Sequence, residues 1–245
     1  MTDIEKISKS RTIIKELLSN EWKTEDIPEL SSEEIRQLYN SSENKNFIYS
    51  NFGKGSVCNF TLEHTFLEIP KLHVIYYNFP GFNKKKIKIT KSIEKKIIEL
   101  YENKHIGEFD NLFIIINENI TDSIIDIKNN INNRLKEMNV DITSISQDIS
   151  KYNLTRNHFK NINIYSLDSL QINITKHKLV PNHKIIRDKK DIEKILEKCN
   201  CKINQLPSIS KEDPISKIFR AIPGDVFEIE RINTKGTTLY YRVCK

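Results

Sequence analysis

Alanine is almost missing from this chain of 245 residues, since it occurs once, at Ala221, whereas isoleucine occurs 41 times. Cysteine (4), tryptophan (1), glycine (6) and proline (7) are also scarce. Four cysteines do not make a disulfide framework for a chain of this length, so we expect free thiols in a reducing compartment. The isoleucines supply enough core-forming side chains to exclude disorder along the whole chain.

Long apolar runs are also missing. No stretch approaches the roughly 18 consecutive apolar residues that a membrane-spanning helix needs. The N-terminal residues MTDIEKISKS carry charges where a secretory signal needs an apolar run. The sequence therefore predicts a soluble intracellular protein that makes no membrane contact, long enough for one large domain or two ordinary ones.

Acidic and basic residues are unequally divided along the chain. Residues 1–150 carry 20 basic and 23 acidic side chains, whereas residues 151–245 carry 19 and 10. A basic second part fits contact with nucleic acid or with an acidic protein surface. A surplus of this size also fits an ordinary solvated surface, and charge alone does not choose between these readings.

Periodic apolar residues predict helices in both parts. The spacing of Ile4, Ile7 and Ile14 indicates an amphipathic helix over residues 3–20. Ser31-x-x-Glu34 is a capping box that opens a second helix, which runs through Tyr39. Further helices are predicted from the shared face of Ile93, Ile97, Ile98 and Tyr101, over 122–138 with Thr121 as N-cap, from Asp188 to about Lys198, and from Pro214 behind the capping residue Asp213.

Strand patterns alternate with these helices. LFIII (112–116) is apolar throughout, which is typical of a strand buried on both faces. Residues 226–232 and 237–243 flank Asn-Thr-Lys-Gly and predict a hairpin in which Gly236 takes a positive φ. Further strands are expected at 47–52, 57–62, 72–79 and 170–174, with an alternating pattern at 86–90. The fold class is α+β, and we expect domains at 1–145 and 169–245 joined by a connecting segment over 146–168.

No catalytic, cofactor or metal motif stands out. Gly53-Lys54-Gly55-Ser56 lacks the spacing of a phosphate-binding loop, and a surface turn is the simpler interpretation. Cys199-x-Cys201 could join His177 or His183 at a zinc ion, but no C-x-x-C or H-x-x-x-H pattern accompanies it. We therefore expect no catalytic residues, no cofactor and no metal in this chain.

The densest positive run lies in the first part, where Lys84, Lys85, Lys86 and Lys88 follow one another closely. Lysines at such density blunt the edge of a sheet and keep it solvated. They could also contact nucleic-acid phosphates, in a manner independent of base sequence and sensitive to salt.

The C-terminal part resembles a known family. INITKHKLVPNHKII (172–186), NQLPSISKEDPISKIFRAIPGDVFEIER (204–231) and GTTLYYRVCK (236–245) follow in order the pattern of the assembly domain in the fifth subunit of eukaryotic nuclear RNA polymerases and in its archaeal counterpart. The resemblance covers about 75 residues strongly. FDNLFIIINENIT (109–121) is similar, more weakly, to the jaw domain of the eukaryotic protein. The chain departs from the family at Arg220, Ile222 and Pro223, where a basic pair is more common.

The resemblance implies a set of partner-binding residues in the C-terminal domain. Arg231 and Arg242 could make bidentate hydrogen bonds to carboxylates or backbone carbonyls of a partner. His177 and His183 could instead bond within their own loop, Tyr241 could belong to the core, and the prolines and glycines could serve the fold. The set comprises His177, Leu179, Val180, Pro181, His183, Gln205, Leu206, Pro207, Asp213, Pro214, Gly224, Arg231, Tyr241 and Arg242.

The implied architecture is an N-terminal jaw domain with a mixed sheet and helices, followed by a small C-terminal α+β assembly domain. The implied function is that of a noncatalytic subunit, present in one copy within a hetero-oligomeric DNA-directed RNA polymerase. Its C-terminal domain would anchor to the largest subunit beside the homologue of the sixth subunit, and its jaw would face downstream double-stranded DNA. The alternative is a stand-alone DNA-processing enzyme or transcription regulator that carries the C-terminal domain for docking on a polymerase.

Composition and the divergence of the first part leave two sources open. The excess of isoleucine, lysine and asparagine and the divergent region 44–110 fit a large DNA virus with its own transcription machinery, and equally an AT-rich cellular genome. A viral source implies location in the virion or in a cytoplasmic viral factory, and a cellular source implies the nucleus.

Overall fold

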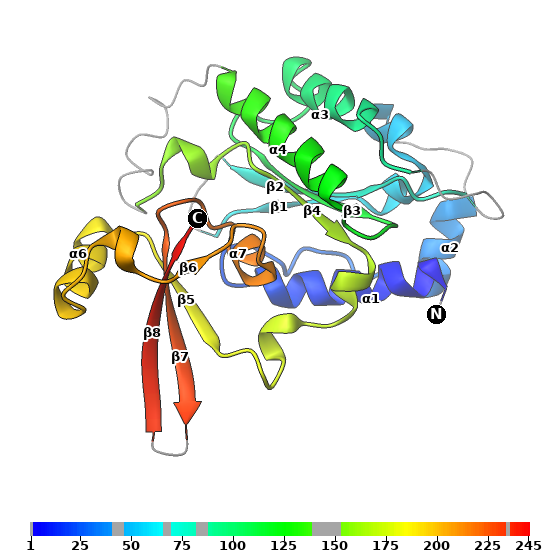
Figure 1. The fold of residues 1–245 in the computed structure, drawn as a ribbon. Coiled ribbons are helices and arrows are strands. Elements are labelled where there is room, and N and C mark those ends of the chain that lie inside the picture. The colour runs from blue at the N-terminus through cyan, green and yellow to red at the C-terminus, as the bar shows by residue number, and fades with distance from the viewer. Residues whose placement is uncertain (1, 41–46, 66–69, 82–87, 139–152, 234–235) are drawn as a thin grey trace. The chain divides into compact units, whose positions relative to one another are not determined.

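The computed structural model describes residues 2–40, 47–65, 70–81, 88–138, 153–233 and 236–245 (Figure 1). The chain forms two compact units. Unit 1 comprises Met1–Asp141 and Phe159–Ile172, and unit 2 comprises Ile142–His158 and Asn173–Lys245. Both contain helices and a sheet, as the α+β class requires. None of the helices in these described ranges is both long enough and apolar enough to cross a bilayer.

Unit 1 is built on a four-stranded mixed sheet. Its strands are β1 (Phe60–Glu63), β2 (Lys71–Tyr77), β3 (Asn111–Ile116) and β4 (Ile162–Ser166), and they lie in the order β1-β2-β3-β4. β1 is antiparallel to β2, whereas β3 runs parallel to both β2 and β4. All six residues of β3 are buried, which confirms the strand predicted from its apolar run.

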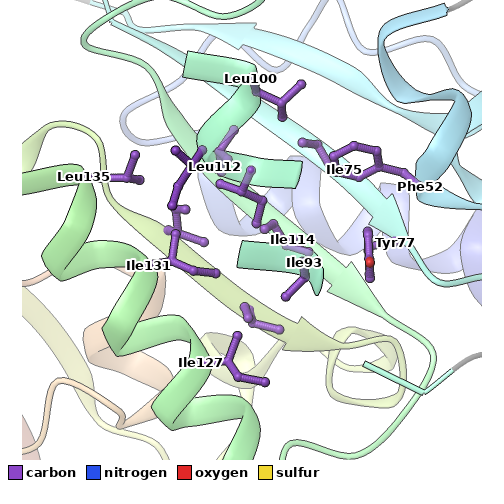
Figure 2. Packing of buried hydrophobic residues seen from close by; sticks show 14 of the residues in the cluster. Phe52, Ile75, Tyr77, Ile93, Leu100, Leu112, Ile114, Ile127, Ile131 and Leu135 are labelled. Carbon is purple, nitrogen blue, oxygen red and sulfur yellow. The ribbon is translucent and has the colours of Figure 1, made fainter. Parts of the chain in front are cut away.

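Helices cover both faces of this sheet. Helices α3 (Ser92–Glu102) and α4 (Asp122–Glu137) pack on one face, and Figure 2 shows their isoleucines and leucines meeting Ile75, Leu112 and Ile114. The opposite face meets α1 (Asp3–Leu18), where the hydroxyls of Ser10 and Tyr76 lie 2.9 Å apart. Because side chains alternate along a strand, β2 serves both layers with successive residues.

Local signals set the helix ends as predicted. The Glu34 side chain accepts a hydrogen bond from the Ser31 backbone N–H, and the Ser31 hydroxyl accepts one from the Glu34 N–H, so the capping box opens α2 (Ser32–Asn40). Thr121 holds the N-cap position of α4, although its hydroxyl lies against that of Ser123 and caps no backbone N–H.

Two predicted elements before β2 differ in the structure. Residues 47–52 form a 3₁₀ helix, η1 (Phe47–Phe52), and not a strand. Tyr49 and Phe52 are buried and make an edge-to-face contact there, so burial of the aromatic rings does not require an extended backbone. The strand predicted at 57–62 begins at Phe60, behind a second 3₁₀ helix, η2 (Lys54–Cys58). Gly55 and Ser56 in η2 are buried, so this segment is not the surface turn we expected.

The amino ends of β2 and β3 are joined by a buried carboxylate. Asp110 accepts hydrogen bonds from the backbone N–H groups of Lys71 at 2.8 Å and Gly107 at 2.7 Å, and it lies 2.8 Å from Nε2 of His73. The Nδ1 atom of His73 lies 3.0 Å from the Thr61 hydroxyl on β1. This chain of polar contacts fixes the ends of three strands relative to one another.

Unit 2 contains a second four-stranded mixed sheet, with strand order β5-β7-β8-β6. β7 (Val226–Asn233) is antiparallel to both β5 (Asn182–Ile186) and β8 (Gly236–Cys244), and β8 is parallel to the short β6 (Ser208–Ile209). The predicted hairpin of β7 and β8 is confirmed, and Gly236 has a φ of 126°. The α-helices among its described residues are α6 (Lys189–Lys198) and α7 (Pro214–Ile218), both with the predicted N-caps.

The sequence analysis missed several elements near the boundary between the units. Residues 170–174 are not a strand, because the chain there forms the 3₁₀ helices η5 (Asp168–Gln171) and η6 (Ile174–Lys176). Strands β4, β5 and β6 and the 3₁₀ helices η4 (Arg156–His158) and η7 (Ile203–Gln205) were not predicted. β4 lies within the stretch 146–168, which the sequence predicts to connect the two domains.

Candidate docking surface of the C-terminal unit

The hairpin of β7 and β8 presents two chemically different faces. Antiparallel partners point to the same side of a sheet, so the register assigns each side chain to a face. The arginine face consists of Phe227, Ile229, Arg231, Thr238, Tyr240 and Arg242. The glutamate face consists of Val226, Glu228, Glu230, Ile232, Thr237, Leu239, Tyr241 and Val243.

The base of the hairpin is covered on both faces. On the arginine face, Phe227 and Ile229 form a cluster with Ile215 of α7 and with Ile209 of β6. On the glutamate face, Val226 and Val243 pack with Leu206, and the α6 residues Ile192 and Leu196 lie against them. This burial fixes the base of the hairpin and therefore the direction in which the rest of it points.

The far half of the hairpin has no such cover. Ile232 is 85% exposed, Leu239 is 44% exposed and Tyr240 is 43% exposed. Figure 1 shows β7 and β8 extending past β5, α6 and α7 of the same unit. Ile232 and Leu239 are diagonal neighbours on the glutamate face. Large apolar side chains grouped at an uncovered end of a rigid element are typical of a protein interface.

The segment 177–183, made of the loop before β5 and the first two residues of that strand, holds five of the predicted partner-binding residues. Its histidines bond internally, because His177 Nδ1 accepts from the Leu179 N–H at 3.2 Å and His183 Nδ1 lies 2.7 Å from the Pro181 carbonyl oxygen. Leu179 is 82% exposed, whereas Val180 packs against the cluster of Phe227. The internal bonds agree with one of the two alternatives that the sequence leaves open for the histidines, and a contact with a partner stays a prediction.

Most of the motif residues after α6 help to form the fold. The Gln205 side chain accepts a hydrogen bond from the Lys202 N–H, Leu206 is buried, and Pro207 accepts from the Val243 N–H. The Asp213 carboxylate accepts from the Ile215 N–H and opens α7 with Pro214 at its first position. Gly224 has a φ of 102°, which favours glycine in the turn before β7.

Arg231, Tyr241 and Arg242 lie at different levels of the hairpin. The Arg231 guanidinium stacks over the Tyr240 ring, 4.8 Å from its centre. Arg242 pairs with Phe227 near the base, and its Nη1 lies 3.4 Å from the Ser208 carbonyl oxygen. Tyr241 donates a hydrogen bond to Glu228 at 3.1 Å, and partial burial together with this carboxylate raises the pKa of its hydroxyl.

The sequence analysis missed a buried polar cluster beneath the turn at Gly224. The Asp225 carboxylate lies 3.5 Å from Nε2 of His158 and 3.5 Å from Nε of Arg187. The same carboxylate accepts a hydrogen bond from the Ile222 N–H, and Arg187 donates to the Phe219 carbonyl at 2.8 Å. No sequence motif marks this cluster, because its members lie far apart in the chain.

Other candidate residues give no site in the described part of the chain. Lys84, Lys85 and Lys86 lie outside the described residues, and Lys88 is exposed. Cys199 is an exposed free thiol and Cys201 is half-buried. The described ranges hold no group of three His, Cys, Asp or Glu side chains suited to a metal ion.

Comparison with known proteins finds similarity over the C-terminal unit. The family model "RNA polymerase Rpb5, C-terminal domain" matches residues 172–244. DNA-directed RNA polymerase subunit Rpo5 of Methanococcus maripaludis is 41% identical over 71 residues, which cover 29% of this chain and 90% of that protein. Rpo5 of Pyrococcus abyssi is 43% identical over 74 residues, or 30% of this chain and 89% of that protein. Rpo5 of Methanosphaera stadtmanae is 35% identical over 77 residues, which cover 31% of this chain and 99% of that protein.

Proposed function

This chain belongs to the RNA polymerase Rpb5 family and is a subunit of a DNA-directed RNA polymerase, and from that premise we propose that unit 2 anchors it to the largest subunit of that enzyme. The relatives consist almost entirely of the matched domain and are themselves polymerase subunits. The capacity to join a polymerase is therefore expected to reside in residues 172–244 of this chain.

The exposed apolar end of the hairpin carries the proposal. Ile232 and Leu239 form one patch, and Ile232 is 85% exposed. Burying an isoleucine side chain stabilises a complex by about 1.5–3 kcal/mol. The hairpin is held at its base by two apolar clusters, so it loses little conformational freedom on docking.

We further propose that unit 1 serves as a jaw beside downstream double-stranded DNA, and that the homologue of the sixth subunit lies next to unit 2. The positive run that includes Lys88 is the candidate for phosphate contact, which would depend on salt but not on base sequence. The cellular location would be that of the polymerase, and the relatives give no support to a viral source.

Co-expression with the largest subunit tests the anchoring role. The double variant Ile232→Ser with Leu239→Ser is expected to lose most co-purification, because the patch no longer offers apolar area. Ile203→Ser is the matched control, since Ile203 is also an exposed isoleucine of unit 2, at 39%, but belongs to η7 and not to the hairpin. Equal co-purification of the double variant and the control would refute the proposed anchor.

Lys88→Glu tests the jaw role in the assembled polymerase. A jaw that contacts phosphates predicts weaker crosslinking of this chain to downstream DNA, with a smaller dependence on salt. Lys184→Glu, on β5 of unit 2, is the control for a general loss of positive charge. Crosslinking that neither salt nor Lys88→Glu changes would contradict phosphate contact at this position.

A further inference from the structure

Charges on the hairpin are sorted by face. Arg231 and Arg242 lie on the arginine face, and His183 of β5 joins them because it pairs with Ile229. Glu228 and Glu230 lie on the glutamate face. Among the described residues of β5, β7 and β8, the arginine face therefore carries positive or titratable basic side chains and no carboxylate.

One of the two segments that pack on this face has the same sign, and the other, residues 209–221, carries Lys211, Lys217 and Arg220 against Glu212 and Asp213. Ile174 and Val180 belong to the border of the apolar cluster that contains Phe227 and Ile229. Residues 169–187 include Lys176 and Lys178 and contain no Asp or Glu. Neither Arg231 nor Arg242 has a carboxylate within 4.0 Å in the described ranges of the chain. Within those ranges the protein thus leaves both guanidinium groups without a charged partner.

Resting on the proposed anchoring role, we infer that the arginine face binds an acidic, extended segment of the protein partner. Arg231 pairs with Thr238, so Arg231 and Arg242 lie four residues apart along the hairpin, with Tyr240 between them. At about 3.3 Å per residue this separation is roughly 13 Å. A partner segment in extended conformation, with two carboxylates four residues apart, spans the same distance and reaches both guanidinium groups.

The stacked guanidinium of Arg231 suits this recognition. Its contact with the Tyr240 ring holds the planar group while its N–H edge stays available for a carboxylate. Tyr240 is 43% exposed and offers apolar area to the same segment. The Arg231 side chain is therefore ordered before the partner binds, which lowers the entropic cost of forming the ion pairs.

The opposite face favours a protein over a nucleic acid as the occupant. Glu230 adjoins Arg231 in sequence but points to the glutamate face, together with Ile232 and Leu239. A nucleic acid around this hairpin would face a carboxylate and leave exposed isoleucine and leucine uncovered. A protein partner can supply carboxylates to one face and apolar side chains to the other.

Charge reversal in the full chain, co-expressed with the largest polymerase subunit, tests this inference. Arg231→Glu is expected to weaken co-purification about tenfold or more, because it places a carboxylate opposite carboxylates. Arg231→Lys should retain most binding. Glu230→Lys is the matched control, since it changes the charge of the neighbouring residue on the other face and should have little effect. A thermal unfolding transition shared by all variants shows that the fold is intact.

A zero-length carbodiimide crosslink identifies the occupant. In Arg231→Lys the new amine is expected to couple to an Asp or Glu side chain of the largest subunit, and replacing that acid by Lys should restore binding of Arg231→Glu. Failure of the wild-type chain to co-purify would overturn the anchoring role and this inference together. Normal co-purification of Arg231→Glu, or coupling to a second copy of this chain, would overturn the inference alone. The inference would also be overturned if Arg231→Glu lost nucleic-acid binding and Arg231→Lys gave no protein crosslink. That pair of results would indicate that the arginine face binds nucleic-acid phosphates.

Discussion

The Asp225 carboxylate lies 3.5 Å from the His158 imidazole, and this contact joins the matched family domain to the stretch of chain that precedes it. Asp225 lies inside the matched range 172–244, whereas His158 precedes it. His158 Nδ1 accepts a hydrogen bond from the Thr155 N–H at 2.9 Å, and its Nε2 faces Asp225. Unit 2 thus extends the family domain with an upstream segment that the buried carboxylate holds in place.

This contact predicts energetic coupling between the two residues. Each of His158→Ala and Asp225→Asn is expected to destabilise unit 2 by about 1–3 kcal/mol, since His158 accepts a hydrogen bond from the Thr155 N–H and Asp225 accepts one from the Ile222 N–H. The double variant should cost about 0.5–3 kcal/mol less than the sum of the single changes. Denaturant unfolding of the full chain, monitored through hydrogen exchange of the β7 amides, measures this difference in unfolding free energy. Strict additivity would contradict the contact.

Asp110 predicts a pH dependence for unit 1. Burial alone would raise the pKa of this carboxyl, but hydrogen bonds from His73 and from the Lys71 and Gly107 N–H groups outweigh burial, so its pKa lies below the ordinary value. A carboxyl whose pKa is lowered in the folded state stabilises the fold at pH values above its ordinary pKa. This stabilisation disappears as the pH falls through the pKa of the folded state.

The free energy of unfolding of Asp110→Asn should therefore be about 1–3 kcal/mol lower at neutral pH. It should also depend less on pH in the acid range than that of the wild type. Hydrogen exchange at the Lys71 and Gly107 amides, whose N–H groups bond to this carboxylate, reports the change locally. Asp122→Asn is a control at an exposed carboxylate on the first turn of α4. Acid profiles that match between wild type and Asp110→Asn would rule out this role.

Gly55 predicts a steric effect in η2. A Cβ atom at this position would lie 2.7 Å from Cβ and 2.8 Å from Cγ of Phe79, which is 1% exposed. Gly55→Ala is expected to destabilise unit 1 by about 1–3 kcal/mol through overpacking. The double variant with Phe79→Ala, which removes the Cγ and Cδ2 atoms that a Cβ at position 55 would meet, should cost less than the sum of the single changes, and calorimetry of the variants tests this. A double variant no more stable than the sum of the single effects would show that the ring is not the obstacle.

The sequence predicted those parts of the fold whose signals are local. Capping by Ser31, Asp188 and Asp213, the apolar run of β3 and the turn glycine Gly236 each act within a few residues, so one stretch of sequence is sufficient to identify them. The family motif likewise lies in the range 172–244 that the family model matches. The docking roles of its residues stay predictions, because a motif shows which residues recur and not what they contact.

Elements fixed by distant partners were missed. β4 lies in an asparagine-rich stretch, and its first residue Ile162 exchanges two hydrogen bonds with the side chain of Asn132 on α4. Asn111 of β3 similarly accepts from the Asn161 N–H. These contacts let a polar segment join a buried sheet, and no local pattern reveals them. The edge strand β5 depends in the same way on its pairing with β7.

Stoichiometric assembly is the most direct test of the account. The tagged full chain, expressed with the two largest subunits of its polymerase, is expected to purify with both at one copy each, and the Ile232→Ser, Leu239→Ser variant is expected to remain apart from them. Recovery of the wild-type chain alone, under conditions where the two large subunits assemble with each other, would contradict the proposal that its C-terminal hairpin fastens it to the enzyme.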